Sequence, residues 1–416
     1  MKRLLVILLV ILLGMVVLGK TVTIEFWTLS LSPTFDDYIK AIIEDFEKNN
    51  PGIKVNWVDI PYSAAVEKLT AAIAARKAPD VVNLNTSWAL DFIAQDALAA
   101  LDEYIPESVR YVYWENLWNG TMVNGKSYAV PWYASIPIMM YNKELFERAG
   151  LDPEDPPQTW EEVTEAARII KEMTGAYGLE PNIIALDELL LEGIPLVSED
   201  GKKAAFNTPE AVKKLQWFQM LFTEDLMPRS LGGYVEGRQK YSAGQLAMYP
   251  AGLTMLKHIE VNSPDIYGVT DVSTYPLGKA KLVKVSLMNM AIPFTSKYKE
   301  EAAKFILWAT SPYWQVKFSN YATIVPSTKI GLDTDPEFIK KAESGDLKAK
   351  AMIMASKAMR YGIDLNSHLV HKIPLDKYAE FRRILQEYWI AAIKGEYTAE
   401  EALRKAEEEC NKLLEK

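Results

Sequence analysis

Hydrophobic and polar positions in the first third of the chain follow two periods in turn. Short runs that alternate or are wholly apolar, and are rich in β-branched and aromatic residues, predict strands at Thr21–Trp27, Ile53–Asp59 and Asp80–Leu84. Apolar residues spaced three or four apart predict helices between and after these strands, at 33–48, 64–76 and 87–95. Strands and helices that alternate at this spacing indicate right-handed βαβ units and a mainly parallel sheet.

The alternation continues less regularly in the middle of the chain, and the last third is helical. Strand-like segments lie at Ser127–Tyr141 and Lys284–Ile292. Thr159–Glu162 and Thr398–Glu401 are capping boxes, which start helices. Helices are expected at 160–172, 209–222, 299–308, 311–319, 347–359, 375–394 and 398–414. No linker or repeat interrupts these elements, so two domains require the chain to cross between them more than once.

Residues 1–20 have the pattern of an export signal. Lys2 and Arg3 precede an apolar run from Leu4 to Leu18, and Val17–Gly19 offers modest residues for cleavage. The run is shorter than the about 20 residues of a comfortable bilayer span, and an uncleaved signal anchor is the alternative. No cysteine lies near the predicted cut. We therefore expect a periplasmic or secreted protein without a lipid anchor.

Length and charge narrow the class of protein. Residues 21–416 are too many for one ordinary core and about right for two. The formal net charge of the whole chain is −9, and removal of Lys2, Arg3 and Lys20 with the signal makes the remainder more acidic. Nucleic-acid binding needs basic surfaces that neutralise phosphate, so no nucleic-acid partner is expected.

The sequence carries little of the chemistry of enzymes or metal sites. It has no glycine-rich phosphate loop and no G-x-S-x-G elbow. His258, His368 and His371 show no metal-binding pattern, and the single cysteine, Cys410, shares an apolar helical stripe and is expected to be buried. No catalytic residue, metal or cofactor is therefore predicted. Abundant carboxylates keep a secreted carbohydrate-active enzyme as an alternative.

Seven segments, in order along the chain, resemble the extracellular solute-binding protein family 1, the maltose-binding-protein-like substrate-binding proteins of sugar ABC transporters. They are Phe46–Val55, Ala75–Val82, Tyr128–Tyr133 followed by Tyr141–Gly150, Pro156–Glu161, Ala243–Met248, Ala291–Phe305 and Gly395–Leu403. Two positions depart from the family pattern: Leu287–Met288 replaces a glycine pair, and Thr254 stands near the place of an aromatic residue.

The resemblance implies an α/β fold of the two-lobed periplasmic-binding-protein type (type II), in which each lobe has a mainly parallel sheet flanked by helices. It implies a first lobe of residues 21–131 plus 290–324 and a second lobe of residues 132–289 plus 325–416. A helical segment ends the chain, and the ligand cleft lies between the lobes.

Neutral sugars present hydroxyl rims and apolar C–H faces, so their sites need aromatic rings and multidentate polar side chains. In α/β lobes such side chains lie on loops at the carboxyl ends of strands. Ser30 follows the first predicted strand, and Asn85, Ser87 and Trp88 follow the third. Trp27 is either core or cleft floor, and Ser87 is either a helix cap or a ligand contact.

Further candidates come from the first crossing and from the second lobe. Adjacent aromatic residues on a strand point to opposite faces, so one of Trp132 and Tyr133 is expected to face the cleft. Glu180 resembles the glutamate of the family's Glu-Pro-aromatic ligand segment, with Asn182 in place of the aromatic residue. The resemblance and the third crossing add two tyrosines: Tyr249 and Tyr321.

The function implied by the resemblance is that of a hinged clamp. A sugar or oligosaccharide that touches both lobes favours the closed form, which then docks on the membrane permease subunits of an ABC-type importer. We expect a monomer. The alternatives within the same fold are a clamp for a polyol, a sugar phosphate or a polyamine.

Overall fold

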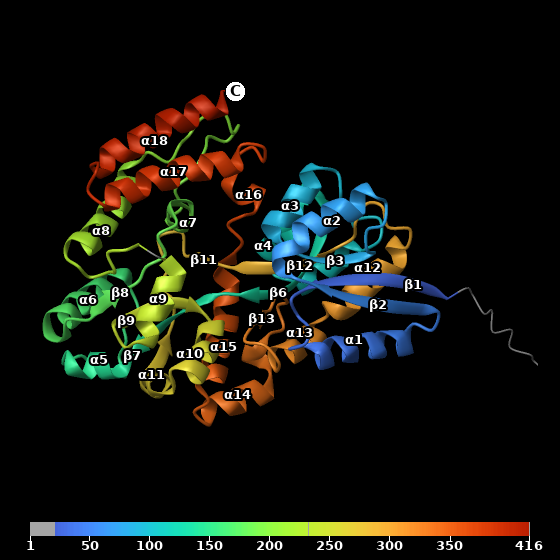
Figure 1. Ribbon diagram of the computed structural model, residues 1–416, viewed down its shortest axis with the longest axis horizontal. Helices are drawn as coiled ribbons and strands as arrows, with labels where there is room; N and C mark the ends of the chain where they lie inside the picture. The colour runs from blue at the N-terminus through green and yellow to red at the C-terminus, as the bar shows by residue number, and fades with distance from the viewer. Residues whose placement is uncertain (1–20, 232, 416) are drawn as a thin grey trace, which may run out of the picture.

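The strands expected at the start of the chain form half of a six-stranded sheet in the computed structural model, which describes residues 21–231 and 233–415 (Figure 1). β1 (Val22–Leu29) pairs in parallel with β2 (Ile53–Ile60) and β3 (Val81–Asn85), which confirms the predicted parallel start. The strand order is β13-β6-β12-β3-β1-β2. Three strands come from later in the chain: β6 (Ala129–Ser135), β12 (Ser286–Ala291) and β13 (Val325–Pro326). The predicted export signal lies outside the described residues.

Helices cover both faces of this first sheet. On one face, Phe26, Trp132 and Phe305 belong to a core that the sheet shares with α1 (Asp36–Asn49), α12 (Lys299–Ala309) and α13 (Pro312–Ser319). On the other face, Leu84 packs beneath α2 (Ala65–Ala74) and α3 (Thr86–Ala94). The helix expected to start at Ser32–Pro33 starts instead at Asp36, because a turn intervenes in which the Phe35 N–H donates to the Leu31 carbonyl.

A second sheet of four strands has the order β10-β7-β9-β8. Its strands are β7 (Pro137–Asn142), β8 (Tyr177–Leu179), β9 (Leu246–Gly252) and β10 (Thr270–Ser273). The helices packed around it are α5 (Lys143–Arg148), α6 (Trp160–Thr174), α7 (Ala185–Leu191), α8 (Pro209–Thr223), α9 (Gly233–Ser242), α10 (Thr254–Asn262), α11 (Pro264–Val269), α14 (Pro336–Glu343) and α15 (Leu347–Ala358). The two sheets and their helices form the two lobes seen in Figure 1.

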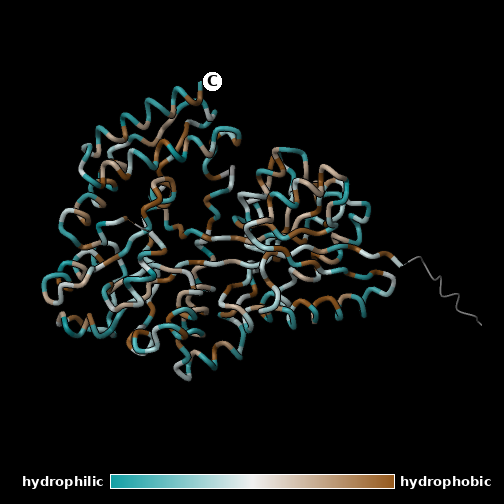
Figure 2. Tube along the Cα trace, viewed as in Figure 1, coloured by the Kyte–Doolittle hydropathy of each residue, from teal (hydrophilic) through white to brown (hydrophobic). Residues whose placement is uncertain are grey.

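The chain ends in a pair of helices on the second lobe. α17 (Tyr378–Ile393) and α18 (Ala399–Leu414) pack against each other, and Figure 2 shows hydrophobic and hydrophilic positions alternating along both. Thr398 and Thr159 form the two predicted capping boxes, at the starts of α18 and α6. Cys410 is fully buried in this packing, which confirms the prediction for that residue.

The remaining elements are short. They are α4 (Glu115–Trp118), α16 (His368–His371), a hairpin of β4 (Met122–Val123) and β5 (Lys126–Ser127), a parallel pair of β11 (Val283–Lys284) and β14 (Gly362–Ile363), and 3₁₀ turns at 62–64, 107–112, 119–121, 332–334 and 359–361. Among the described helices none combines the length and apolarity that crossing a bilayer requires.

The strand directions bring the loops of both sheets to one place. β12 is antiparallel to β3 and to β6, so the carboxyl ends of β1, β2, β3 and β6 lie along one edge of the first sheet. β7 is antiparallel to β9 and β10, so its amino end lies beside the carboxyl ends of the other strands of the second sheet. Ile136 alone separates β6 from β7. The loop-bearing edges of the two sheets therefore lie next to each other. The lobe boundaries at residues 131, 289 and 325 stay a prediction.

Candidate functional site

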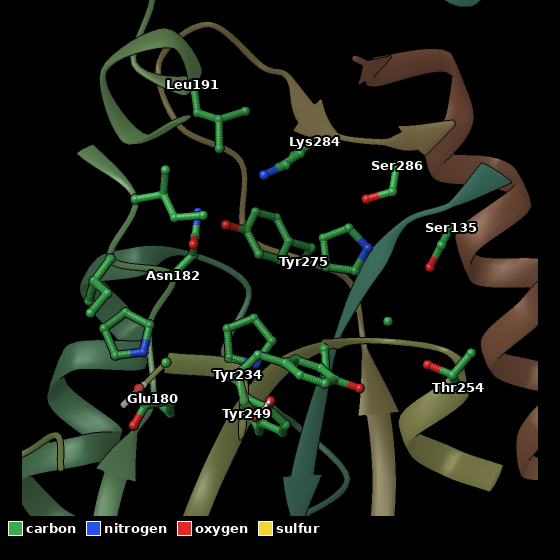
Figure 3. A pocket seen from close by; sticks show the side chains of 18 residues that line it. Ser135, Glu180, Asn182, Leu191, Tyr234, Tyr249, Thr254, Tyr275, Lys284 and Ser286 are labelled. Atoms are coloured by element: carbon green, nitrogen blue, oxygen red, sulfur yellow. Dashed lines mark hydrogen bonds between the residues drawn. The ribbon is translucent and has the colours of Figure 1, made fainter. Parts of the chain in front are cut away.

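A cavity of about 410 Å³ opens at the carboxyl ends of β8 and β9 (Figure 3). Its polar and aromatic lining residues come from the second lobe and from the segments that join the lobes. They are Ser135, Glu180, Asn182, Tyr234, Tyr249, Thr254, Tyr275, Lys284 and Ser286. This is the position that the strand-end rule predicts for a ligand site in an α/β lobe.

Glu180 is the most unusual group of this cavity. It follows β8 directly, its backbone N–H donates to the Met248 carbonyl of β9, and the residue is 2% exposed. Neither carboxyl oxygen has a hydrogen-bond partner. Burial, with a further contribution from Glu236, raises the pKa of the Glu180 carboxyl to about 8, against an opposing effect of Lys240. A buried carboxyl with free acceptor capacity is suited to bind a donor that enters the cavity.

Tyrosine rings surround this carboxyl. Tyr249 of β9 is buried, and its hydroxyl donates to the backbone carbonyl of Tyr234 at 2.8 Å. The rings of Tyr249 and Tyr234 lie 6.2 Å apart, and Tyr234 is 51% exposed. Gly237 of α9 allows this arrangement, since a Cβ there would lie 2.6 Å from the Tyr249 ring and 2.8 Å from Glu180 Cγ. The cavity thus pairs an apolar aromatic wall with a buried acceptor.

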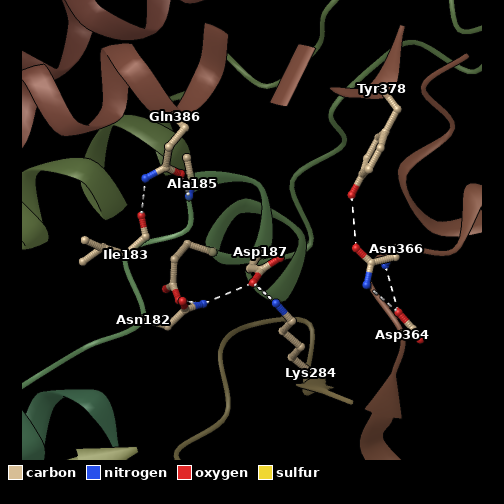
Figure 4. A network of polar contacts seen from close by, with 10 residues as sticks. Asn182, Ile183, Ala185, Asp187, Lys284, Asp364, Asn366, Tyr378 and Gln386 are labelled. Carbon is tan, nitrogen blue, oxygen red and sulfur yellow. Dashed lines mark hydrogen bonds and ion pairs between the residues drawn. The ribbon is translucent and has the colours of Figure 1, made fainter. Parts of the chain in front are cut away.

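A polar network holds the upper wall of the cavity (Figure 4). The Asn182 amide donates to Asp187 at 3.3 Å, and the Lys284 ammonium pairs with the same carboxylate. Gln386 of α17 fixes the loop between Asn182 and Asp187. Its side chain donates to the Ile183 carbonyl and accepts from the Ala185 N–H, both at 2.9 Å. The side chains of Asn182 and Lys284 are therefore positioned at the cavity by buried partners.

Across from the second lobe, the first lobe offers an aromatic and amide cluster. Tyr62, two residues after the end of β2, lies with its ring centroid 4.6 Å from that of Trp88, and its hydroxyl accepts from the Asn85 amide at 2.8 Å. Asn85 also caps α3 by accepting the Trp88 N–H, so the expected cap at Ser87 is wrong and Ser87 lies in the first turn of the helix. Ser30 accepts the backbone N–H of Tyr62 at 2.9 Å. The structure thus brings Ser30, Asn85 and Trp88 together.

Two further candidates on the strands of the first sheet, Trp27 and Trp132, differ in their exposure. Trp27 is half-buried beside this cluster, and its indole N–H donates to Glu25 at 2.6 Å. Trp132 is completely buried, with its ring against Phe26 and Phe318, so it offers no surface to a ligand. This corrects the expectation for Trp132.

Tyr133 and Tyr321 lie apart from the Glu180 cavity. Tyr133 is partly exposed, and both residues line a second cavity of about 620 Å³ between the lobes. Apart from Trp132, the predicted site residues thus fall into three groups: the first-lobe cluster, the Glu180 cavity with Glu180 and Tyr249, and this second cavity.

Sequence reasoning missed Tyr62 of the first-lobe cluster and several residues that line the Glu180 cavity. Tyr62 follows a predicted strand, so the rule that selected Asn85 would have found it. Tyr234 and Tyr275 follow elements that carried no clear pattern, and Lys284 was assigned only to a strand. Their proximity to Glu180 arises from the fold, since they lie between about 54 and 104 positions away along the chain.

The buried carboxyl predicts a dependence of stability on pH. The folded-state pKa of about 8 lies above the ordinary value of 4.5. Glu180 therefore stabilises the fold fully below pH 4.5, and this contribution is lost as the pH rises to about 8. Relative to Glu180→Gln, the wild-type free energy of unfolding should fall by about 1.4 kcal/mol per pH unit across that window. Urea titrations of both proteins from pH 5 to pH 8 measure this; parallel profiles would contradict it.

In the described part of the chain, no group of three or more histidine, cysteine or carboxylate residues has the geometry to hold a metal ion.

The model of the bacterial extracellular solute-binding protein family matches residues 32–316. The chain belongs to this family. Among curated members, the sn-glycerol-3-phosphate-binding periplasmic protein of Escherichia coli K12 is 24% identical over 442 residues, which cover 97% of this chain and 95% of that protein. Members of the family are substrate-binding proteins rather than enzymes, so the carbohydrate-active enzyme alternative is overturned.

Two solved structures of this family are similar over the whole fold. A protein of Synechococcus sp. MITs9220, named as an oligosaccharide periplasmic-binding protein, has a TM-score of 0.81 and 26% identity, and the match covers 94% of this chain and 99% of that one. An ABC transporter solute-binding protein of Thermotoga lettingae TMO, bound with α-D-tagatose, has a TM-score of 0.71 and 25% identity, with coverage of 94% and 100%. This solute-binding protein therefore has the predicted two-lobed fold, and its family places it outside the cytoplasm, in ABC-type import.

Proposed function

We propose that this protein binds a neutral sugar between the Glu180 cavity of the second lobe and the Tyr62–Trp88 cluster of the first. The observation that carries the proposal is the buried, unpartnered Glu180 carboxyl beside the rings of Tyr234 and Tyr249. Sugar hydroxyls supply the missing donors, and aromatic rings cover the C–H faces of the sugar. The names and the bound ligand of the two similar structures support the same class of ligand.

The charges of the cavity favour a neutral ligand over the alternatives. Among its described lining residues the only cation is Lys284, which Asp187 neutralises, and the only carboxylate is Glu180. A sugar phosphate needs converging cations, and a polyamine needs several carboxylates. A linear polyol lacks the ring face that the tyrosines are arranged to cover.

We infer that binding works by closure of two lobes, 21–131 plus 290–324 and 132–289 plus 325–416. A sugar held by Glu180 on one side and by Asn85 and Trp88 on the other makes both sets of contacts only in a closed form, which it therefore favours. The closed monomer then delivers the sugar to the importer's membrane subunits, after residues 1–20 have directed export. The acidic chain has no nucleic-acid partner.

A thermal-shift screen tests the ligand class. Mono-, di- and oligosaccharides, linear polyols, glycerol 3-phosphate and spermidine are each added to the mature protein. A sugar at 100 times its Kd raises the free energy of unfolding by about 2.7 kcal/mol and so raises the Tm. A shift with glycerol 3-phosphate or spermidine, and none with any sugar, would refute the proposal.

A further inference from the structure

Asp59, near the carboxyl end of β2, holds the loop that follows β1. Its Oδ1 atom accepts the Thr28 hydroxyl at 2.6 Å and the Leu31 N–H at 3.0 Å, and its Oδ2 atom accepts the Ser32 N–H at 3.2 Å. The parallel register of β1 and β2 places Asp59 opposite Thr28. Asp59 lines neither the Glu180 cavity nor the second cavity. This one carboxylate therefore ties the end of β1 to the loop beyond it.

The direction of the bond between Thr28 and Asp59 is fixed by a third side chain. The indole N–H of Trp57, which can only donate, bonds the Thr28 hydroxyl oxygen at 2.7 Å. Thr28 is fully buried, so its hydroxyl hydrogen is left to Asp59. All three groups that face the Asp59 carboxylate are therefore donors, and each of them needs an acceptor.

Ser30 has an unfavourable backbone conformation within this loop. Its φ is 53°, in the left-handed region that a residue with a Cβ rarely adopts. The Ser30 N–H donates to the Ile60 carbonyl at 2.9 Å, and the two residues after it are held by Asp59. Successive N–H groups in such a turn form a concavity that binds an anion, and the Asp59 carboxylate occupies it. Bonds on both sides of Ser30 thus maintain the left-handed turn.

Ser30 connects this loop to the first-lobe cluster. Its hydroxyl oxygen accepts the Tyr62 N–H at 2.9 Å. The Tyr62 hydroxyl in turn accepts the Asn85 amide, and its ring lies beside Trp88. Tyr62 is 45% exposed, so its place depends on these few contacts more than on burial. A shift of Ser30 would therefore be passed on to the Tyr62 ring.

We propose that Asp59 is a positioning residue of the sugar site. By holding Ser30 in its left-handed conformation, it keeps the Tyr62 ring where a sugar bound between the lobes lies against it. This inference rests on the proposed function and adds to it a residue that touches no sugar. Because the loop is held before the sugar enters, less conformational freedom is lost on binding.

Replacing Asp59 with asparagine tests the proposal without a change of shape. In either orientation of the new amide, its NH2 group faces a backbone N–H that needs an acceptor. Hydrogen–deuterium exchange of the sugar-free mature protein, read by mass spectrometry, should show the Tyr62 amide exchanging about tenfold faster than in the wild type. Exchange at Tyr62 that is unchanged in Asp59→Asn overturns the inference.

Titration calorimetry tests the consequence for binding, with glucose, xylose, maltose, cellobiose and their longer homologues as probes. For the sugar that the wild type binds, the Kd should rise about three- to tenfold in Asp59→Asn. Because Asp59 acts through Ser30, the double variant Asp59→Asn/Ser30→Ala should bind no more weakly than Ser30→Ala alone. Independent effects would multiply the two increases in Kd, and that outcome overturns the inference. Absence of binding by every sugar overturns the proposed function as well, whereas unchanged exchange at Tyr62 overturns this inference alone.

Two further variants support the comparison. Asp59→Ala removes every acceptor at this position and should change the exchange and the Kd at least as much as Asp59→Asn. Asp37→Asn is the matched control, since Asp37 is exposed in the first turn of α1 and lines neither cavity. It should leave both measurements at wild-type values. Circular dichroism and melting curves establish that each variant folds; wild-type values in folded Asp59→Ala overturn the inference.

Discussion

Replacing Glu180 with glutamine is expected to weaken sugar binding about 10- to 150-fold, the loss that corresponds to a hydrogen bond to a charged group. The variant keeps the shape of the side chain and its place after β8, but it removes the carboxylate that the free protein buries without a partner. Titration calorimetry at pH 8.5, where the wild-type carboxyl is ionised, measures the change.

The wild-type protein and Glu180→Gln should also differ in how their affinity for the sugar depends on pH. Hydroxyls that donate to the carboxylate stabilise its charged form, so the pKa of Glu180 falls below about 8 when the sugar is bound. Binding then releases a proton, and wild-type affinity increases with pH until about pH 8, whereas the variant shows no such increase. Glu199→Gln, at an exposed position outside the cavity, is the control. An unchanged affinity in Glu180→Gln would remove this residue from the site.

Replacing Lys214 with methionine is expected to lower the free energy of unfolding by about 3–5 kcal/mol at neutral pH, the usual cost of breaking a buried ion pair. The Lys214 side chain is 11% exposed and bonds Glu188 at 3.0 Å and Glu192 at 3.1 Å. Its ammonium also lies 4.8 Å from the centre of the Trp217 ring. Methionine fits the apolar surroundings but leaves the buried carboxylates without a cation.

The size of this loss should depend on pH in a defined direction. Burial already raises the pKa of Glu188, against the attraction of Lys214. Without the lysine this pKa rises further, so acid protonates Glu188 in the folded variant and the deficit shrinks as the pH falls. Urea unfolding at pH 5 and pH 7.5 measures both values, and Lys213→Met, at the exposed neighbouring position, is the control. A loss under 1 kcal/mol at both pH values would contradict the prediction.

The local elements of this protein were determined by its sequence. The strands β1, β2 and β3 and the capping boxes at Thr159 and Thr398 depend on side-chain period and on contacts a few residues apart, and both are visible along the chain. Glu180 was found because the segment Glu180–Asn182 resembles a ligand segment of the family. The resemblance of ordered segments then led from these elements to the two-lobed fold.

Which side chains meet was decided by the tertiary structure. Trp132 and Tyr133 are neighbours in sequence, yet one is sealed against Phe26 and the other lines a cavity, because the register of β6 assigns each to a different environment. The aromatic cluster of Tyr62 and Trp88 joins the ends of two strands, and Thr254 lies between the Glu180 cavity and a second cavity whose walls come from both lobes. The burial of a side chain and the walls of a cavity depend on segments that lie far apart in the sequence. The periodicity of one segment therefore does not reveal them.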